Sequence, residues 1–256
     1  MNMKRNHVAD DRIAKLLAFV VMSAVFFITW ESIVRFSSIS FLIVPPPSAV
    51  LRVFMTRGDY LFNNAAQTVI EAAFGFLIGA SAGILLATLF IFSKIVEDAL
   101  YPYAIALKAV PLVAIAPIVV TWFGTGILSK IVLAAIISFF PVLVNTVEGL
   151  KSTEPEPIAL FESWSASSWQ VFTKLRLPYA LPSIFSGLKI ASSFAVIGAV
   201  VAEFIGAQAG IGHVIKSSTY FLSTDVTFAA IIVSALIGIA FFAVVSIIER
   251  KVVFWR

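Results

Sequence analysis

The sequence has no cysteine among its 256 residues, which excludes disulfide bonds and metal sites with thiolate ligands. Its two histidines, His7 and His213, lie far apart, so we expect no metal centre. Charged residues are scarce too, at 12% of the chain, against about 25% in a soluble domain. Hydrophobic residues make up 60%, and the mean hydropathy is +1.02. A chain this apolar cannot shield its surface from water by folding, so we expect a lipid bilayer around it.

Patterns that would indicate other protein classes are also missing. The apolar–polar alternation of a membrane β-barrel is absent, so helices are expected to satisfy the backbone in lipid. The glycine-rich segment 206–212 lacks the Lys-Ser/Thr ending of a Walker phosphate loop. No Ser/His/Asp or paired-carboxylate arrangement has a suitable spacing. The sequence therefore predicts an all-α membrane protein with no catalytic residues, and not an enzyme.

Long apolar runs predict about six transmembrane helices, since a helix crosses the hydrocarbon core with about 20 residues. The expected spans are 13–34, 66–92, 100–122, 127–147, 184–205 and 228–248. Segment 37–59 is expected to connect the first two spans and to contain a short helix, and residues 124–126 to form a tight turn.

Prolines and glycines predict local features of two spans. Pro102, Pro111 and Pro117 should kink or break the third span, because proline lacks the backbone donor that a helix needs. The second span carries three glycines at a spacing of four residues, which predicts a surface for close helix packing. These glycines are Gly75, Gly79 and Gly83.

The distribution of basic residues predicts the orientation in the membrane. Twelve of the eighteen Lys and Arg residues fall on one side of the expected spans and five on the other, with Lys108 inside the third span. Cytoplasmic loops carry an excess of Lys and Arg. Both termini and the polar segment 151–182 are therefore expected in the cytoplasm.

Segment 151–182 is predicted to form a helical hairpin. Ser167 with Gln170 three residues later forms a capping box, which would start the second helix. Pro178 and Pro182 are expected to end that helix. Apolar residues recur at a spacing of three before and after the turn. They are Ile158, Phe161 and Trp164, then Trp169, Phe172 and Leu175.

The residues alone leave two interpretations of this hairpin open. In one, it lies in the headgroup layer with its aromatic side chains at the interface, and with Lys174 and Arg176 toward lipid phosphates. In the other, Trp169 and Phe172 belong to a surface that docks on a cytoplasmic protein.

Residues 165–172 read Ser-Ala-Ser-Ser-Trp-Gln-Val-Phe, and residues 177–182 read Leu-Pro-Tyr-Ala-Leu-Pro. This order resembles the G-A-S-x-W-x-x-F and L-P-x-x-x-P pattern of the EAA loop in binding-protein-dependent ABC importer permeases. Similar motifs occur along nearly the whole chain and resemble the nitrate, sulfonate and taurine subgroup. They lie at 44–50, 122–124, 139–141, 145–146, 186–191 and 201–204.

The resemblance implies the type I ABC importer permease fold in a bacterial inner membrane. It implies one domain over residues 1–256, with a core at 62–248 and a cytoplasmic coupling loop at 151–182. The chain would form the path of a small organic solute, with no cofactor of its own, because ATP would bind to partner ATPase subunits. Further expected partners are an external or periplasmic solute-binding protein, a second copy of the permease and the lipid bilayer, but no nucleic acid.

The resemblance also implies which residues couple the chain to the ATPase. These residues are Glu162, Ser165, Ala166, Trp169, Phe172, Leu177, Pro178 and Pro182. Two positions depart from the family pattern. Ala159 stands in place of the glutamate that names the motif, with Glu162 three residues later, and Ser165 stands in place of the turn glycine. Serine adopts a positive φ less readily than glycine.

The stretch 161–166 is most similar to riboflavin and thiamine-precursor permeases. This points to an aromatic heterocycle as the solute, while a sulfonate- or nitrate-like solute stays open.

Polar residues within spans are candidates for the translocation path, because burying them in lipid is costly. The candidates are Glu71 in the second span, and Asn145 and Glu203 near span ends. Glu71 could instead lie at the interface or bond to a neighbouring helix. Lys108 could extend toward the cytoplasm or pair with Glu71.

Two other functions stay open on the sequence. A stand-alone secondary transporter or channel would work without an ATPase, but it gives the hairpin no role. An intramembrane enzyme is disfavoured, since no catalytic constellation is found.

Overall fold

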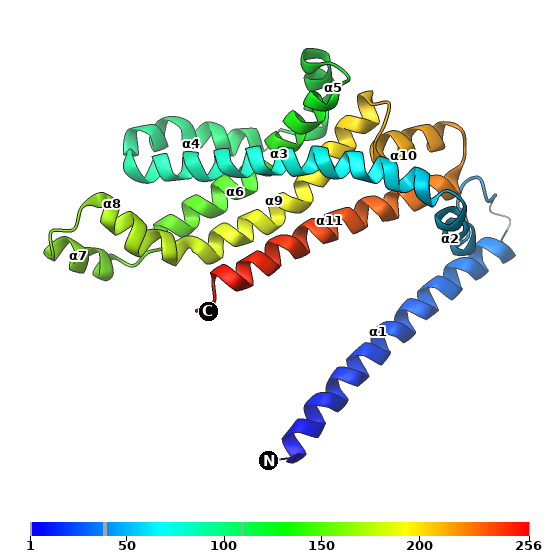
Figure 1. Ribbon diagram of the computed structural model, residues 1–256, viewed down its shortest axis with the longest axis horizontal. Coiled ribbons are helices and arrows are strands. Elements are labelled where there is room, and N and C mark those ends of the chain that lie inside the picture. Colours follow the sequence, from blue (N-terminus) through cyan, green and yellow to red (C-terminus); the bar gives the residue numbers. More distant parts are fainter. Residues whose placement is uncertain (1, 38–39, 109, 256) are drawn as a thin grey trace. The chain divides into compact units, whose positions relative to one another are not determined.

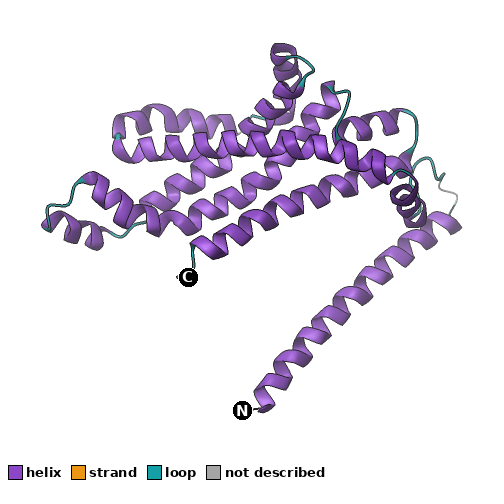
Figure 2. Cartoon of the chain, in the orientation of Figure 1, coloured by secondary structure: helices purple, strands orange, loops and turns teal. Residues whose placement is uncertain are grey.

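The computed structural model describes residues 2–37, 40–108 and 110–255, and every regular element in those ranges is a helix (Figures 1 and 2). The helices are α1 (Asn2–Phe36), α2 (Pro47–Thr56), α3 (Gly58–Phe92), α4 (Lys94–Lys108), α5 (Leu112–Phe123), α6 (Ile127–Lys151), α7 (Pro155–Ser163), α8 (Ser168–Val171), α9 (Leu177–Gly206), α10 (Ile211–Tyr220) and α11 (Thr224–Val252). A π-helical turn, η1 (Phe172–Arg176), joins α8 to α9. The all-α prediction is confirmed, and α10 is an element that the sequence analysis did not predict.

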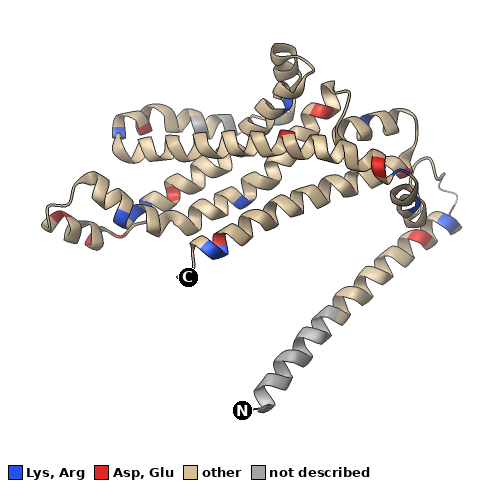
Figure 3. Ribbon diagram, in the orientation of Figure 1, with Lys and Arg blue, Asp and Glu red and all other residues tan. Residues whose placement is uncertain are grey.

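Five of the described segments are long and apolar enough to cross a membrane. They are Leu17–Phe36, Gly58–Phe92, Ile127–Lys151, Ser168–Gly206 and Thr224–Val252. They match every expected span except the third. Along α11 the charged residues lie only toward the two ends of the helix (Figure 3). Many large apolar side chains on these helices are exposed, such as Phe19 at 71%, as expected for residues that face lipid.

The third expected span is broken at Pro111, as predicted, whereas Pro102 and Pro117 lie inside α4 and α5. α4 ends at Lys108, and Pro111 precedes α5 in an extended conformation, with φ −65° and ψ 100°. Proline donates no backbone hydrogen bond and disfavours helical conformation in the residue before it. The result is two shorter helices in place of one long span.

The chain divides into two compact units, residues 1–58 with 217–229 and residues 59–216 with 230–256. In the first unit the rings of Trp30 and Phe228 lie 5.8 Å apart. The Thr224 hydroxyl donates a hydrogen bond to the Phe41 carbonyl at 3.0 Å. The single domain over 1–256 stays a prediction.

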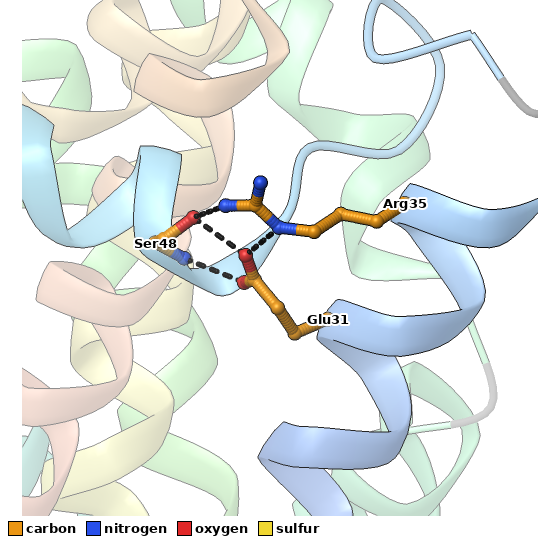
Figure 4. A network of polar contacts seen from close by, with 3 residues as sticks. All are labelled: Glu31, Arg35 and Ser48. Atoms are coloured by element: carbon orange, nitrogen blue, oxygen red, sulfur yellow. Dashed lines mark hydrogen bonds and ion pairs between the residues drawn. The ribbon is translucent and has the colours of Figure 1, made fainter.

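A polar network joins α1 to the first turn of α2 within the first unit (Figure 4). The Ser48 backbone N–H donates to Glu31 Oε2 at 3.0 Å, and the Ser48 hydroxyl donates to Glu31 Oε1 at 2.8 Å. Arg35 pairs with the same carboxylate and donates to Ser48 Oγ at 3.1 Å. The first backbone N–H groups of a helix have no hydrogen-bond acceptor within that helix. Here the Glu31 carboxylate of α1 is the acceptor for the Ser48 N–H.

The core of the second unit is built on close contact between α3 and α6. A Cβ atom added to Gly75 would lie 2.4 Å from the Ala134 Cβ, and one added to Gly79 would lie 2.3 Å from the Ala135 carbonyl oxygen. Gly83 is similarly confined. The close-packing surface predicted for these glycines is confirmed.

α9 packs on α6 in the same manner, and α11 packs on α9. A Cβ on Gly198 of α9 would lie 2.8 Å from the Ala134 Cα of α6. An ion pair between Lys189 and Glu249, at 2.8 Å, links α9 to α11. The α3–α6–α9 layer is therefore the rigid part of the second unit, to which the functional segments attach.

We predict that Gly79→Ala destabilises the protein, because the new methyl group collides with the Ala135 backbone of α6 as well as with the Ser138 hydroxyl. Overpacking of this kind costs about 1–3 kcal/mol. The measurement is the unfolding temperature of the purified chain in detergent.

The control for this prediction is Gly238→Ala on α11, where an added Cβ meets nothing within 4 Å. This variant should keep or raise the unfolding temperature, because alanine favours helix. Equal unfolding temperatures for the two variants would contradict the packing argument.

Candidate functional site

Segment 151–182 folds as the predicted hairpin, with α8 following α7 after a short turn. The Gln170 backbone N–H donates to Ser167 Oγ at 3.3 Å, and the Ser167 backbone N–H donates to Gln170 Oε1 at 2.8 Å. This is the predicted capping box, and it starts α8 where the sequence placed the second helix.

The turn after α7 explains why a glycine is favoured at position 165. Ser165 has φ +56°, in the left-handed region. Its N–H donates to the Glu162 carbonyl at 2.9 Å, and the Ala166 N–H donates to the Phe161 carbonyl at 3.1 Å. These two bonds form a Schellman motif, whose left-handed residue is usually glycine. The turn keeps its geometry with serine in a conformation that is costly for an L residue.

Aromatic packing attaches the hairpin to the second unit. Phe172 is buried in a cluster with Leu150, Ala180 and Ile184. The ring of Trp169 stacks on Phe172, with centroids 5.5 Å apart, and on Phe92 at the end of α3, at 6.0 Å. Phe172 is thus an anchor of the hairpin and not an exposed docking side chain.

The prediction that Pro178 and Pro182 end the second helix of the hairpin is wrong. The chain passes from α8 through η1 into α9, which runs unbroken from Leu177 to Gly206. Pro178 lies in the first turn of α9, directly after a π turn that has already shifted the hydrogen-bond register. A proline at that place removes no needed donor. Pro182, one turn later, removes one backbone hydrogen bond from α9. Packing of α9 against α6 and α11 keeps the helix intact there.

The exposed surface of the hairpin includes three of the predicted coupling residues, Glu162, Ser165 and Trp169. Trp169 is 62% exposed despite its stacking. Trp164 at 69% and Leu160 at 50% are exposed as well. The sequence analysis named neither as a coupling residue: Trp164 was noted only as one of the apolar residues at a spacing of three. Large apolar side chains on a polar surface indicate an interaction site.

Of the other predicted coupling residues, Ala166 lies in the turn of the tip, and the rest lie at the base of the hairpin, namely Phe172, Leu177, Pro178 and Pro182. Leu177 packs against the Phe172 cluster. Ala166, Pro178 and Pro182 are half-buried. The structure therefore separates an exposed tip, residues 160–169, from a base that joins the tip to α9.

An ion pair braces the end of α6 beside the hairpin. The Lys151 ammonium donates to Glu97 Oε1 of α4. This hydrogen bond holds the pKa of the Glu97 carboxyl below its usual value. The carboxylate is therefore charged at neutral pH and ties α4 to the segment that leads into α7.

Asn145 lines a cavity of about 530 Å³ between α5, α6 and α9. Its Nδ2 donates to the Pro141 carbonyl at 2.8 Å, and a Cβ on Gly187 would lie 2.8 Å from its Cβ. Among the described lining residues Asn145 is the only polar one. The lining residues are Val110, Val113, Ile137, Phe140, Pro141, Val144, Asn145, Ile190, Phe194 and Ile197.

Glu71 and Glu203, the two other path candidates, do not line this cavity. They are 2% and 0% exposed and adjoin one another in a polar cluster between α3 and α9. Their role in the path stays a prediction. The side chain of Lys108, the other partner considered for Glu71, lies outside the part of the chain that the structure describes.

Lys130, one of the five basic residues counted on the outer side of the expected spans, is a buried charge. It is 1% exposed, and its ammonium donates to the carbonyls of Thr125 and Gly206, the latter at 2.7 Å. Its position inside the apolar run that starts at Ile127 was the available signal.

The model of the family described as binding-protein-dependent transport system inner membrane component matches residues 75–254. The chain belongs to this family. The chain is therefore the membrane-spanning permease subunit of an ABC importer for a small solute, and the resemblance drawn from the hairpin motif is confirmed. The family works with ATPase and solute-binding protein partners, and the permease is a multi-pass membrane protein.

The permease is similar to named relatives over nearly all its length. It is 34% identical to the formylaminopyrimidine transport permease protein of Halalkalibacterium halodurans, over 99% of both chains. It is 33% identical to a putative aliphatic sulfonates transport permease protein of Bacillus subtilis, over 93% of this chain and 87% of the relative. It is 31% identical to the riboflavin transport system permease protein of Chloroflexus aurantiacus, over 89% of this chain and 85% of the relative.

A chain of the MetNI methionine ABC transporter, solved in inward-facing conformations, has a similar structure. The TM-score is 0.59 at 19% sequence identity, over 82% of this permease and 98% of that chain. The likeness confirms the predicted permease fold.

We predict that Ser165→Gly stabilises the hairpin of the permease by about 1 kcal/mol, because glycine adopts the left-handed conformation without steric cost. The measurement is thermal unfolding followed by the fluorescence of the nearby Trp164 and Trp169. Ser163→Gly, within the helical turn of α7, is the control and should not stabilise. A lower unfolding temperature for Ser165→Gly would contradict the turn assignment.

Proposed function

We propose that this permease transports a flat, uncharged heterocycle of the pyrimidine class, and that the cavity at Asn145 is part of its path. The observation that carries the proposal is the composition of this cavity. It combines one fixed amide with two phenyl rings and an aliphatic lining.

The amide of Asn145 suits the edge of such a ring. One of its two N–H bonds is used by the Pro141 carbonyl at 2.8 Å, so the second N–H and both lone pairs of Oδ1 stay available. The edge of a pyrimidine or a flavin also carries a donor beside an acceptor, so it can form two hydrogen bonds with this amide. Phe140 and Phe194, in the same lining, offer faces and edges against which a flat ring can pack.

Anionic solutes fit this lining less well. A buried anion needs a paired charge or several hydrogen bonds, and the described lining residues include no cation. The named relatives transport both kinds of solute, so sequence identity alone does not separate them. The relative matched over the full length of both chains is named for formylaminopyrimidine, which supports the heterocycle.

The path is proposed to form between two copies of the permease. Val113 and Ile197, on the rim of the cavity, are 59% and 51% exposed, which leaves this side open for a second copy. ATP is proposed to bind only to the ATPase subunits, which would dock on the exposed hairpin tip from the cytoplasm. The excess of Lys and Arg on that side supports this orientation, with both termini inside.

We predict that Trp164→Asp and Trp169→Asp each weaken ATPase binding by about 30-fold or more, because central aromatic side chains dominate protein interfaces. The measurement is the amount of ATPase that co-purifies with tagged permease in mild detergent. Phe254→Asp, at a residue that is 80% exposed near the C-terminus, is the control. Undiminished ATPase recovery with both tryptophan variants would place the contact elsewhere.

We predict that Asn145→Leu lowers uptake of formylaminopyrimidine by about tenfold, because the ring loses its polar partner in an apolar site. Uptake into proteoliposomes that contain the complete importer is the measurement. Ile190→Leu keeps the apolar lining and should transport normally. Taurine and nitrate in excess should not compete, and competition by either would refute the neutral heterocycle.

A further inference from the structure

The chain turns from α9 into α10 between Gly206 and Ile211 (Figure 1). Three consecutive backbone amides at this turn bond to side chains of α3 and α9. The Gly210 N–H donates to Asn64 Oδ1 at 2.8 Å. The Ile211 N–H donates to Thr68 Oγ1 at 2.9 Å, and the Gly212 N–H donates to Glu203 Oε2 at 2.6 Å. The first turn of α10 is therefore held by side chains of two other helices.

Glu203 is the centre of this arrangement. Its Oε1 accepts a hydrogen bond from the Thr68 hydroxyl at 2.7 Å, while its Oε2 accepts from the Gly212 amide. One carboxylate of α9 thus bonds to α3 and to α10 together. We call Glu203, Thr68, Asn64 and the amides of residues 210–212 the α10 clamp.

The backbone is shaped to receive the carboxylate. Gly210 has φ +103°, and a Cβ there would lie 2.2 Å from Glu203 Oε1. A Cβ on Gly212 would lie 2.1 Å from the Val200 carbonyl oxygen. Only glycine at both positions lets the turn approach α9 this closely.

The clamp is buried at a place where polar groups are costly. Glu203 and Thr68 are 0% exposed. A buried carboxylate is tolerated only when it is bonded, and breaking such a bond costs more than the bond contributes. Apolar side chains packed at this position would cost less free energy of burial than the polar clamp does. We therefore infer that the clamp has a role besides stabilising the fold.

The position of Glu203 on α9 suggests that role. α9 is continuous from the base of the hairpin at Leu177 to Gly206, a length of about 45 Å at 1.5 Å per residue. A displacement at the hairpin therefore reaches Glu203 through one unbroken helix. The clamp connects this far end of α9 to α10.

We propose that Glu203 is a positioning residue that makes α10 move with α9 when the hairpin is displaced during the transport cycle. This inference rests on the proposed ATPase contact at the hairpin. Without the clamp, ATP hydrolysis would still move α9, but α10 would not follow, and solute transport would fall relative to hydrolysis.

The test compares Glu203→Ala with Glu203→Gln in the complete importer, with solute transported per ATP hydrolysed as the readout. Glutamine keeps an acceptor for the Gly212 amide. Its amide nitrogen then takes the place of Oε1 beside Thr68, whose hydroxyl can still donate to the Asn64 carbonyl at 3.2 Å. We expect alanine to lower the ratio by about tenfold, as for loss of a charged hydrogen bond, and glutamine to restore most of it.

Gly79→Ala is the control for a merely structural effect, because it disturbs packing away from the clamp. It should lower transport and hydrolysis together and leave their ratio unchanged. A ratio that Glu203→Ala also leaves unchanged would overturn the inference. If the wild-type importer shows no ATP-dependent transport, the proposed function fails, and this inference fails with it.

A spectroscopic measurement tests the clamp independently of transport. The chain has no cysteine, so a single cysteine at Tyr220, which is 81% exposed on α10, can carry a spin label without background labelling. Glu203→Ala should raise the mobility of the label, and Glu203→Gln should not. Equal mobility in wild type and both variants would show that Glu203 does not hold α10.

Discussion

Close approach of α3, α6 and α9 sets the positions of the functional groups in the second unit. Inside a bilayer there is no hydrophobic drive for helices to associate, so small residues that let backbones touch provide much of the stabilisation. Gly79 and Gly198 meet α6 at distances that leave no room for a methyl group. The same packing holds Asn145 against Gly187 at the cavity. The cavity and the base of the hairpin are therefore parts of one rigid layer.

Three polar side chains of this layer have defined hydrogen-bond partners. Asn145 is held by a carbonyl of its own helix and faces an apolar cavity. Glu203 is enclosed and bonded to two other segments. The Lys130 ammonium donates hydrogen bonds to the carbonyls of Thr125, in the turn before α6, and of Gly206, at the end of α9. Polar groups are expensive in lipid. Asn145 is the amide that we propose meets the solute, whereas Glu203 and Lys130 hold helices together.

Much of the fold could be predicted from the sequence, because it depends on local and periodic signals. Span length, the capping box at Ser167, the break at Pro111 and the spacing of glycines are of this kind. The features that were missed depend on tertiary context. Pro178 was read as a helix end, because the π turn that accommodates it leaves no trace in residue pattern. α10 is short, and side chains distant in sequence fix its start. The helix was therefore not predicted from its own residues.

The candidate site divides in the same way. The sequence motif located the hairpin, but only the structure shows that Phe172 is an anchor while Trp164 is exposed. A spacing of three residues predicts that side chains share one face of a helix. It does not predict whether that face packs against the protein or is exposed. Glu203 was selected as a path candidate, which stays a prediction, but its bond to Thr68 of α3 joins residues 135 positions apart and left no local signal in the sequence.

The account depends on one claim: this permease moves its solute only when an ATPase drives the hairpin. The most direct measurement is uptake of formylaminopyrimidine by proteoliposomes that contain the permease, its ATPase and its binding protein, with and without ATP. The account predicts accumulation only when ATP and the ATPase are both present. Equal accumulation by the permease alone would contradict it and indicate a stand-alone transporter.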